Sequence, residues 1–384
     1  MSDHIPFEIQ IEIMSWLPVK SLIRFGSVSK TFKSLIGSSK FIADYSKLQY
    51  SRRQHLLIIS YQYPLYAKHN SFVSIVDDDT FPEHKRFLIT SECREVLPYQ
   101  TLIGSSHGLF CFVGHSRYNE SAMLMAVAVI WNPSIRKTVT IRPKKGFQYS
   151  ETLGFGVCPN TVDPKIVRFG KGSCKDNYNA EVFTLSSRMW RSISSSNILL
   201  SMHINISFIQ SNVVVIDGFI YWLGYVTSGP FLIVSFDLTS EKLMEIHLPD
   251  ELGLSCQRYH NLEIFKLRES LTVIRHEGKA RDNVYEVWKM EINGVTRSFT
   301  KLFNIDILPE LLVRNLCGFT KNGQLIVEAV HDSCDGELIV YEPCTKSIIN
   351  LGINWSCYGS SESTPYTESL LLMLVDKPYT LIYT

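Results

Sequence analysis

The sequence has no long apolar run and almost no net charge, and each absence excludes a class of protein. No stretch approaches the roughly 20 apolar residues that a membrane-spanning helix needs, so we expect no membrane partner. The 38 Lys and Arg nearly balance the 37 Asp and Glu, which leaves a net charge of +1. This balance gives no basic surface of the kind that binds nucleic acid. The first residues carry Asp3, Glu8 and Glu12 without a long apolar run, so we expect no signal peptide.

The spacing of cysteine and histidine gives no sign of a disulfide framework, a metal site or a cofactor. The nine cysteines are odd in number, are scattered, and include no Cys-x-x-Cys pair. This pattern favours free thiols in a reducing compartment, so we predict a cytoplasmic or nuclear protein. The eleven His are never spaced i, i+4. The segment from Gly170 to Ser173 lacks the full Walker spacing, so we expect no metal and no cofactor.

The N-terminal 45 residues contain four short helical patterns. Ile5, Ile9 and Ile13 form an apolar stripe at i, i+4 and i+8, which begins near Pro6 and ends at Pro18. The other predicted boundaries are Gly26 as the end of the second helix, Ser27 or Ser29 as the cap of the third, Gly37 as its end, and Ser38 or Ser39 as the cap of the fourth. Such small helices carry more apolar surface than they can bury alone, so we expect them to dock on something.

This stretch resembles the F-box proteins, and specifically the plant type. The residues that match the family pattern are Pro6, Ile9, Ile13, Leu17, Pro18, Val19, Lys20, Ser21, Leu22, Arg24, Phe25, Val28, Ser29, Lys30, Leu35, Ile36 and Phe41. The departures are Ile5 for Leu, Gly26 and Ser27 for Arg-Cys, and Phe32 for Trp. Gly26 leaves the form of the turn after the second helix open.

We call the N-terminal helical module, residues 1–45, the head. The resemblance implies that the head binds a Skp-family adaptor and, through it, cullin and RING subunits. The residues predicted to bind the adaptor are Ile5, Pro6, Ile9, Ile13, Leu17, Pro18, Val19, Leu22 and Phe25. Some of them must instead pack the core of the module, and the sequence does not divide the two groups. Val28, Phe32, Leu35 and Ile36 are the better candidates for the internal role.

From His55 onward the chain has the texture of a β domain with a repeat. Residues 46–56 are polar and basic and are predicted to be a linker. Five later hairpin patterns each place an aromatic residue just before a turn: Trp131, Phe183, Phe236, Trp288 and Tyr341. A near-constant period close to 50 residues is typical of propeller blades, with kelch as the nearest template. Counting the hairpin near residue 75 gives about six blades, and the last segment, 369–384, is expected to close the ring.

The predicted architecture is therefore an α+β multidomain chain. Residues 1–45 form a helical F-box module, 46–56 a linker, and 57–384 an all-β, kelch-like propeller that folds on its own and leaves the head free. The β segments resemble the plant F-box-associated interaction domain, for example at 105–112, 130–137, 180–193 and 365–372, although Ser106 and His107 depart from it. The resemblance implies a non-enzymatic substrate receptor of an SCF-type ubiquitin ligase, whose β domain binds a target protein.

Two other functions stay open at this point. One is a propeller that binds a protein or glycan without any ligase, for which Trp131, Trp190, Trp222 and Trp288 are the candidate aromatics. The other is a serine hydrolase at Ser106, because residues 104–108 fit G-x-S-x-G. A strand pattern rather than a helix follows Ser106, which favours an ordinary β-turn. Irregular stretches at 142–152, 170–179, 194–207 and 354–367 are the candidate target-binding loops.

Overall fold

The structure, a computed structural model, describes most of the chain. The described residues are 5–51, 56–61, 71–78, 80–87, 101–117, 124–142, 151–171, 178–199, 206–226, 230–253, 262–277, 284–294, 296–308, 311–330, 336–355, 361–375 and 379–383. The cores of the four predicted target-binding loops, at 143–150, 172–177, 200–205 and 356–360, lie outside these ranges.

The head consists of the four predicted helices. They are α1 (Phe7–Ser15), α2 (Val19–Val28), α3 (Lys30–Ile36) and α4 (Ser39–Ser51). Ser29 Oγ accepts a hydrogen bond from Phe32 N at 3.3 Å, and Ser38 Oγ accepts one from Phe41 N at 3.2 Å. These two serines are thus the caps that the sequence left undecided. The prediction that α2 ends at Gly26 is wrong, because the helix continues through Gly26 to Val28.

Helix α4 holds the head together from its C-terminal half. Tyr45 Oη donates to the carbonyl of Leu17 at 2.9 Å, which fixes the turn between α1 and α2. Gln49 Nε2 donates to the carbonyl of Ser15 at 3.4 Å. The segment expected to be a linker, 46–56, is therefore helical up to Ser51, and residues 52–55 lie outside the described part.

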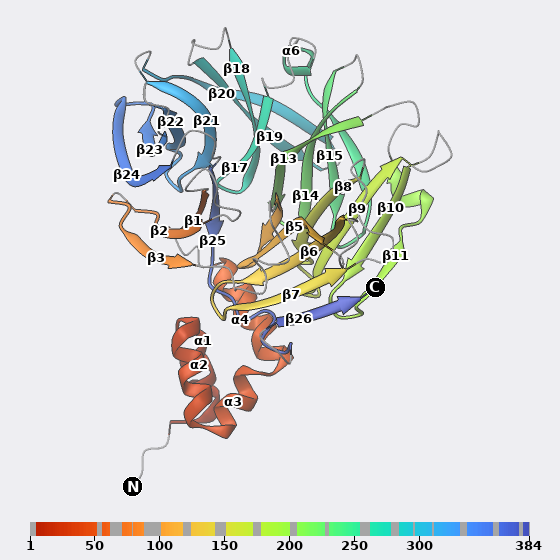
Figure 1. Ribbon diagram of the computed structural model, residues 1–384, viewed down its shortest axis with the longest axis vertical. Helices are drawn as coiled ribbons and strands as arrows, with labels where there is room; N and C mark the ends of the chain where they lie inside the picture. Colours follow the sequence, from red (N-terminus) through yellow and green to blue (C-terminus); the bar gives the residue numbers. More distant parts are fainter. Residues whose placement is uncertain are drawn as a thin grey trace.

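The rest of the described chain forms six blades arranged as a propeller, and their strands are antiparallel except for the outermost strands of blades 2 and 4, which pair in parallel (Figure 1). From the innermost strand outward, blade 1 is β25 (Ser361–Tyr366), β1 (Leu56–Tyr61), β2 (Ser71–Val76) and β3 (Glu83–Phe87); blade 2 is β4 (Thr101–Ser106), β5 (Leu109–Arg117), β6 (Leu124–Asn132), β7 (Lys137–Arg142) and β26 (Tyr379–Tyr383); blade 3 is β8 (Thr152–Val157), β9 (Pro164–Lys171), β10 (Tyr178–Thr184) and β11 (Met189–Ser192). Blade 4 is β13 (Ile206–Ile216), β14 (Phe219–Val226), β15 (Phe231–Asp237), β16 (Leu243–His247) and β12 (Ile198–Leu199); blade 5 is β17 (Leu262–Leu267), β18 (Ser270–Glu277), β19 (Val284–Asn293) and β20 (Thr296–Asp306); blade 6 is β21 (Leu312–Phe319), β22 (Leu325–Val330), β23 (Gly336–Glu342) and β24 (Ser347–Trp355). Two short helices, η1 (Ser195–Asn197) and α6 (Asp250–Gly253), lie between strands.

The predicted repeat corresponds to one position in five of the blades. Its aromatic residues all lie on the third strand from the centre, and all are buried: Trp131, Phe183, Phe236, Trp288 and Tyr341. Because these side chains fill the space between blades, they do not line a glycan site. Trp222 is buried as well, and its Nε1 donates to Leu153 O at 2.8 Å.

The ring is closed by a different strand from the one predicted. The last segment was expected to pair with β1, but β25 does so, in antiparallel register from Leu56 with Tyr366 to Tyr61 with Ser361. The final strand β26 instead pairs in parallel with β7, on the outer edge of blade 2. The sequence of β25, Ser-Glu-Ser-Thr-Pro-Tyr, has few β-forming residues, so its partner strand rather than its own propensity makes it a strand.

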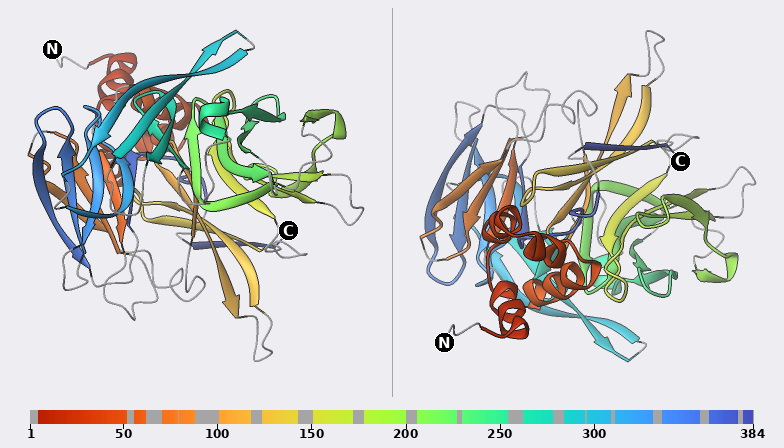
Figure 2. Two further views of the ribbon diagram at one scale, coloured as in Figure 1. Left: turned by 90° about the horizontal axis from the view of Figure 1, so that it is seen from above. Right: turned by 90° about the horizontal axis from the view of Figure 1, so that it is seen from below.

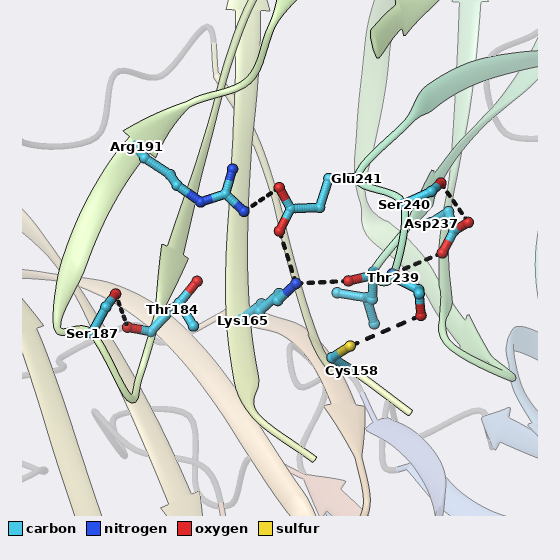
Figure 3. Close-up of polar contacts among 10 residues, drawn as sticks. Cys158, Lys165, Thr184, Ser187, Arg191, Asp237, Thr239, Ser240 and Glu241 are labelled. Atoms are coloured by element: carbon cyan, nitrogen blue, oxygen red, sulfur yellow. Dashed lines mark hydrogen bonds and ion pairs between the residues drawn. The ribbon is translucent and has the colours of Figure 1, made fainter. Parts of the chain in front are cut away.

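The turns between the third and fourth strands of the blades share one backbone conformation. In four blades a residue with positive φ ends the turn: Arg136, Arg188, Glu241 and Lys346, with φ between 54° and 56°. In blade 4 the residue with this conformation, Glu241, belongs to a cluster of ion pairs between two blades (Figure 3). Glu241 Oε1 lies 2.8 Å from Lys165 Nζ of β9, and its other oxygen pairs with Arg191 of β11. Lys165 also donates to Leu238 O at 2.7 Å, so the cluster fastens blade 3 to blade 4.

The head is not independent of the propeller. One hydrophobic cluster contains Met14, Leu22 and Tyr45 of the head together with Leu109 of blade 2 and Leu370 of the segment after β25. Figure 1 shows the head below the propeller, with α4 as the helix nearest to the strands, and Figure 2 gives the view from the head side on the right. The sequence suggested that the β domain leaves the head free. The shared hydrophobic cluster shows instead that the head packs against the β domain.

Candidate functional site

The head presents a concentration of exposed apolar side chains. Half of the large apolar side chains that are exposed in the described residues belong to its first two helices and the residues before them: Ile5, Phe7, Ile9, Ile13, Trp16, Ile23, Phe25 and Val28. We call these eight residues the head face. The side chain of Trp16 is 63% exposed and that of Val28 is 79% exposed. Large apolar residues with such exposed fractions rarely gather in one group on the surface of a protein that has no partner. A group of this kind marks an interaction site.

The residues predicted to bind an adaptor fall into two sets in the structure. Ile5, Pro6, Ile9, Ile13, Pro18 and Phe25 are exposed, and Leu17 is half-buried. Val19 and Leu22 are fully buried, so they pack the core of the chain and offer no surface to a partner. Among the residues expected inside, Ile36 is buried, and Phe32 and Leu35 are half-buried.

Sequence reasoning missed Phe7, Trp16 and Ile23 and placed Val28 inside. The helical period could have found Trp16, the C-cap of α1, because it follows Ile9 by seven residues and so lies on the side opposite Met14, the one buried residue of that helix. The period gives no such signal for Phe7, which precedes Met14 by seven residues and shares its side. No local signal separates Val28 from Val19 on α2. Which of the two is covered depends on what packs against each end of the helix.

A cavity of about 560 Å³ opens at the end of the propeller where the inner strands finish. Its wall includes the turn residues His107, Asp217, Arg268 and Lys321, and Thr367, the residue after β25. The head is joined to this same end, because α4 leads into the start of β1. The cavity is therefore a second candidate binding site, close to the base of the head.

The charges around the cavity are mixed. Burial, together with the positive charge of Lys266, lowers the pKa of His107 to about 4, so its imidazole is neutral at pH 7. Burial raises the pKa of Glu362 to about 7. Lys266 Nζ lies 3.2 Å from a carboxylate oxygen of Glu269, which offsets its charge. The wall thus offers hydrogen-bonding groups of both kinds and no dominant charge that would select one class of ligand.

Ser106 lies in this wall, but not in the geometry that a hydrolase requires. Its Oγ is 2.9 Å from Nδ1 of His107, the next residue in the chain. Ser106 ends β4, His107 turns with a φ of 50°, and β5 begins at Leu109. The nucleophile elbow is a strand–turn–helix, in which the helix start contributes to the oxyanion hole. The strand–turn–strand found here is the inner turn of a blade.

The described residues hold no group of three or more His, Cys, Asp and Glu placed to bind a metal ion. Among the same residues, no helix has both the length and the apolar character to cross a membrane. Four of the cysteines are described, and all carry free thiols: Cys111, Cys158, Cys317 and Cys344.

A six-bladed propeller that carries a helical module with an exposed apolar face defines a two-part interaction protein. Comparison with known proteins agrees: residues 109–346 match the F-box associated beta propeller domain, and residues 2–44 match the F-box domain. Because the first match spans more than half of the chain, the protein belongs to the family of F-box proteins with an F-box associated propeller.

Its relatives are plant proteins. An F-box/kelch-repeat protein of Arabidopsis thaliana is 24% identical over 330 residues, which cover 80% of this chain and 81% of the relative. Another F-box protein of the same plant is 28% identical over 345 residues, covering 85% and 79% of the two chains. Among solved structures, a lectin of Aleuria aurantia is 12% identical and covers 78% of this chain and 92% of its own, with a TM-score of 0.43. That likeness is too distant to say anything about binding.

Proposed function

We propose that this chain is the substrate-recognition subunit of an SCF-type ubiquitin ligase. The head face binds a Skp-family adaptor, which joins the chain to cullin and RING subunits, and the propeller binds a target protein. The observation that carries the proposal is the head face itself. Eight large apolar side chains stay exposed although the other side of the same helices packs into the core.

The mechanism is positional and needs no chemistry in this chain. Binding the target and the adaptor at once holds the lysines of the target near the ubiquitin-charged enzyme. Such tethering raises their effective concentration and so speeds transfer without any new contact. The chain itself is then no enzyme. A ligase of this kind works in the cytoplasm or nucleus, a location that the free thiols of the described cysteines support.

The test is a co-purification with a plant Skp-family adaptor. Ile9→Asp/Ile13→Asp changes two residues of the head face, each 46% exposed, and Ile292→Asp/Ile348→Asp changes two propeller residues that are 53% and 43% exposed. Full burial of an Ile gives about 1.5–3 kcal/mol, so covering the exposed half of two gives roughly 1.5–3 kcal/mol in total. An aspartate buried in their place costs more. We expect the first variant to lose the adaptor and the second to retain it, with both still folded.

Either of two results of this co-purification refutes the proposal. A wild-type chain that never retains the adaptor, or a head-face variant that binds as well as wild type, removes the ligase role. A propeller that then still captures a protein or a glycan would establish the non-ligase alternative. Labelling of Ser106 by an active-site serine probe would instead support hydrolase chemistry.

A further inference from the structure

Helix α2 of the head has no capping side chain of its own. The residue at its N-cap is Pro18, which has no side-chain oxygen and makes no capping hydrogen bond. The first free amide of the helix, Val19 N, instead donates to Oε2 of Glu368 at 2.9 Å. This carboxylate comes from 349 positions further along the chain. A negative group at the N-terminus of a helix satisfies a free N–H and interacts favourably with the helix dipole.

Glu368 belongs to a segment that is firmly attached to blade 2. We call residues 367–375, between β25 and β26, the strap. Asn132 Nδ2 donates to the carbonyls of Ser369 at 2.9 Å and Leu371 at 2.7 Å, and the Asn132 side chain is fully buried. Ser369 N donates to Ser134 Oγ at 3.0 Å. These bonds come from the turn that follows β6, so the strap is fixed to a rigid part of the propeller.

Lys137 and the apolar residues of the strap complete the attachment. Lys137 Nζ donates to the carbonyl of Met373 at 2.9 Å and also to that of Val375. Leu370, Leu371 and Leu372 are buried in the hydrophobic cluster that also holds the core residues of the head. The strap is thus fixed on the propeller side by hydrogen bonds, and on the head side by apolar packing and by the hydrogen bond that Glu368 accepts from Val19 N.

Apolar packing alone is non-directional, so it brings the head to the strap without setting the angle between them. A charge-assisted hydrogen bond to one amide at the end of a helix is directional. We propose that Glu368 is a positioning residue, which fixes the orientation of the head, and hence of any adaptor bound to it, relative to the propeller. The functional meaning of that orientation rests on the proposed ligase role, but the orientation itself is a property of this chain alone.

A spin-label distance measurement on the full chain tests this. Cys344 is exposed and serves as the native label site on the propeller, and Ser34→Cys adds an exposed site on α3. The five cysteines outside the described residues are changed to Ser: Cys93, Cys174, Cys256, Cys334 and Cys357. The buried thiols of Cys111, Cys158 and Cys317 stay. In this background we expect one narrow distribution of distances between the labels.

Three variants decide the outcome. Glu368→Ala removes the acceptor, so we expect the distribution to broaden while the thermal midpoint of the propeller and the retention of the adaptor stay as in wild type. Glu368→Gln keeps a carbonyl acceptor, so we expect the narrow distribution to return. Glu291→Ala, a half-buried glutamate on β19, is the matched control and should stay narrow.

Two results overturn the proposal. One is a Glu368→Ala distribution as narrow as that of wild type. The other is a Glu368→Gln distribution as broad as that of the alanine variant, because the hydrogen bond would then not set the angle. Both are read without any adaptor present, so they are distinct from a failure of the proposed ligase function.

Discussion

The ion cluster between blades 3 and 4 allows the stability of the propeller to be tested at one residue. Glu241→Ala removes the carboxylate that Lys165 and Arg191 share (Figure 3). Only 9% of the Lys165 side chain and 11% of the Glu241 side chain are exposed, whereas Arg191 is 54% exposed. The main cost of the substitution is therefore that the ammonium group of Lys165 stays buried without its carboxylate partner. Within the cluster it keeps one hydrogen-bond acceptor, the carbonyl oxygen of Leu238.

The size of the effect follows from this geometry. Removing one partner of a buried ion pair costs about 3–5 kcal/mol, and the retained bond to Leu238 O places this case near the lower end, at about 3 kcal/mol. At about 2 °C per kcal/mol for a large domain, the thermal midpoint should fall by about 6 °C. Both Glu and Ala have a β-carbon, so the positive φ at this position strains them alike and does not enter the difference.

The matched control is Glu83→Ala. Glu83 pairs with Arg86 at 3.0 Å, but the two side chains are 47% and 68% exposed, so the loss should be about 0–1 kcal/mol. Both variants and wild type are compared by thermal unfolding followed by circular dichroism. Equal midpoints for Glu83→Ala and Glu241→Ala would refute the argument that burial makes the blade 3–blade 4 cluster different.

The effect of Glu241→Ala has a pH dependence with a defined sign. Burial alone would raise the pKa of Glu241, but the hydrogen bonds and charges of Lys165 and Arg191 outweigh it and hold the pKa below the usual 4.5. A lowered pKa contributes stability that is fully present above about pH 4.5 and is lost as the pH falls through the folded value. The gap between wild type and Glu241→Ala should thus be full at pH 7 and shrink below pH 4.5.

Two further substitutions test the cavity wall and the strap. Burial raises the pKa of Glu362 from 4.5 to about 7, so the folded chain binds more protons than the unfolded chain in this window and loses stability as the pH rises through it. The glutamine in Glu362→Gln cannot ionise, so the thermal midpoint of this variant should exceed that of wild type at pH 8 and equal it at pH 4. Midpoints equal to wild type at both pH values would contradict the raised pKa of Glu362. Gly108→Ala places a β-carbon 2.1 Å from the carbonyl oxygen of Thr367, at a φ of 73°. Gly294→Ala at a φ of 64° meets nothing within 4 Å, so it should lose only about 1–2 kcal/mol, and Gly108→Ala considerably more in the same unfolding assay.

The sequence by itself determined the elements that depend on local or repeated patterns. The stripe from Ile5 to Ile13 and the capping serines specified the helices, because a helix is set by residues three and four apart. The five aromatic residues from Trp131 to Tyr341, together with the hairpin near residue 75, predicted about six blades, because each of those five blades buries an aromatic side chain at the same position against its neighbour. The predicted adaptor-binding set came from the family resemblance, which did not separate its exposed members, such as Ile9 and Phe25, from its buried ones.

Only the tertiary structure decided which strand closes the ring and which side of the head is covered. β25 is polar and contains Pro365, and it is a strand because β1, some 300 positions earlier, offers it an edge at the centre of the ring. Val19 is buried in the cluster that also holds Leu370 of the strap, whereas Val28 at the other end of the same helix is exposed. Contacts between residues so far apart leave no periodic trace in the sequence, and Glu368 therefore gives no sign there of the helix that it caps.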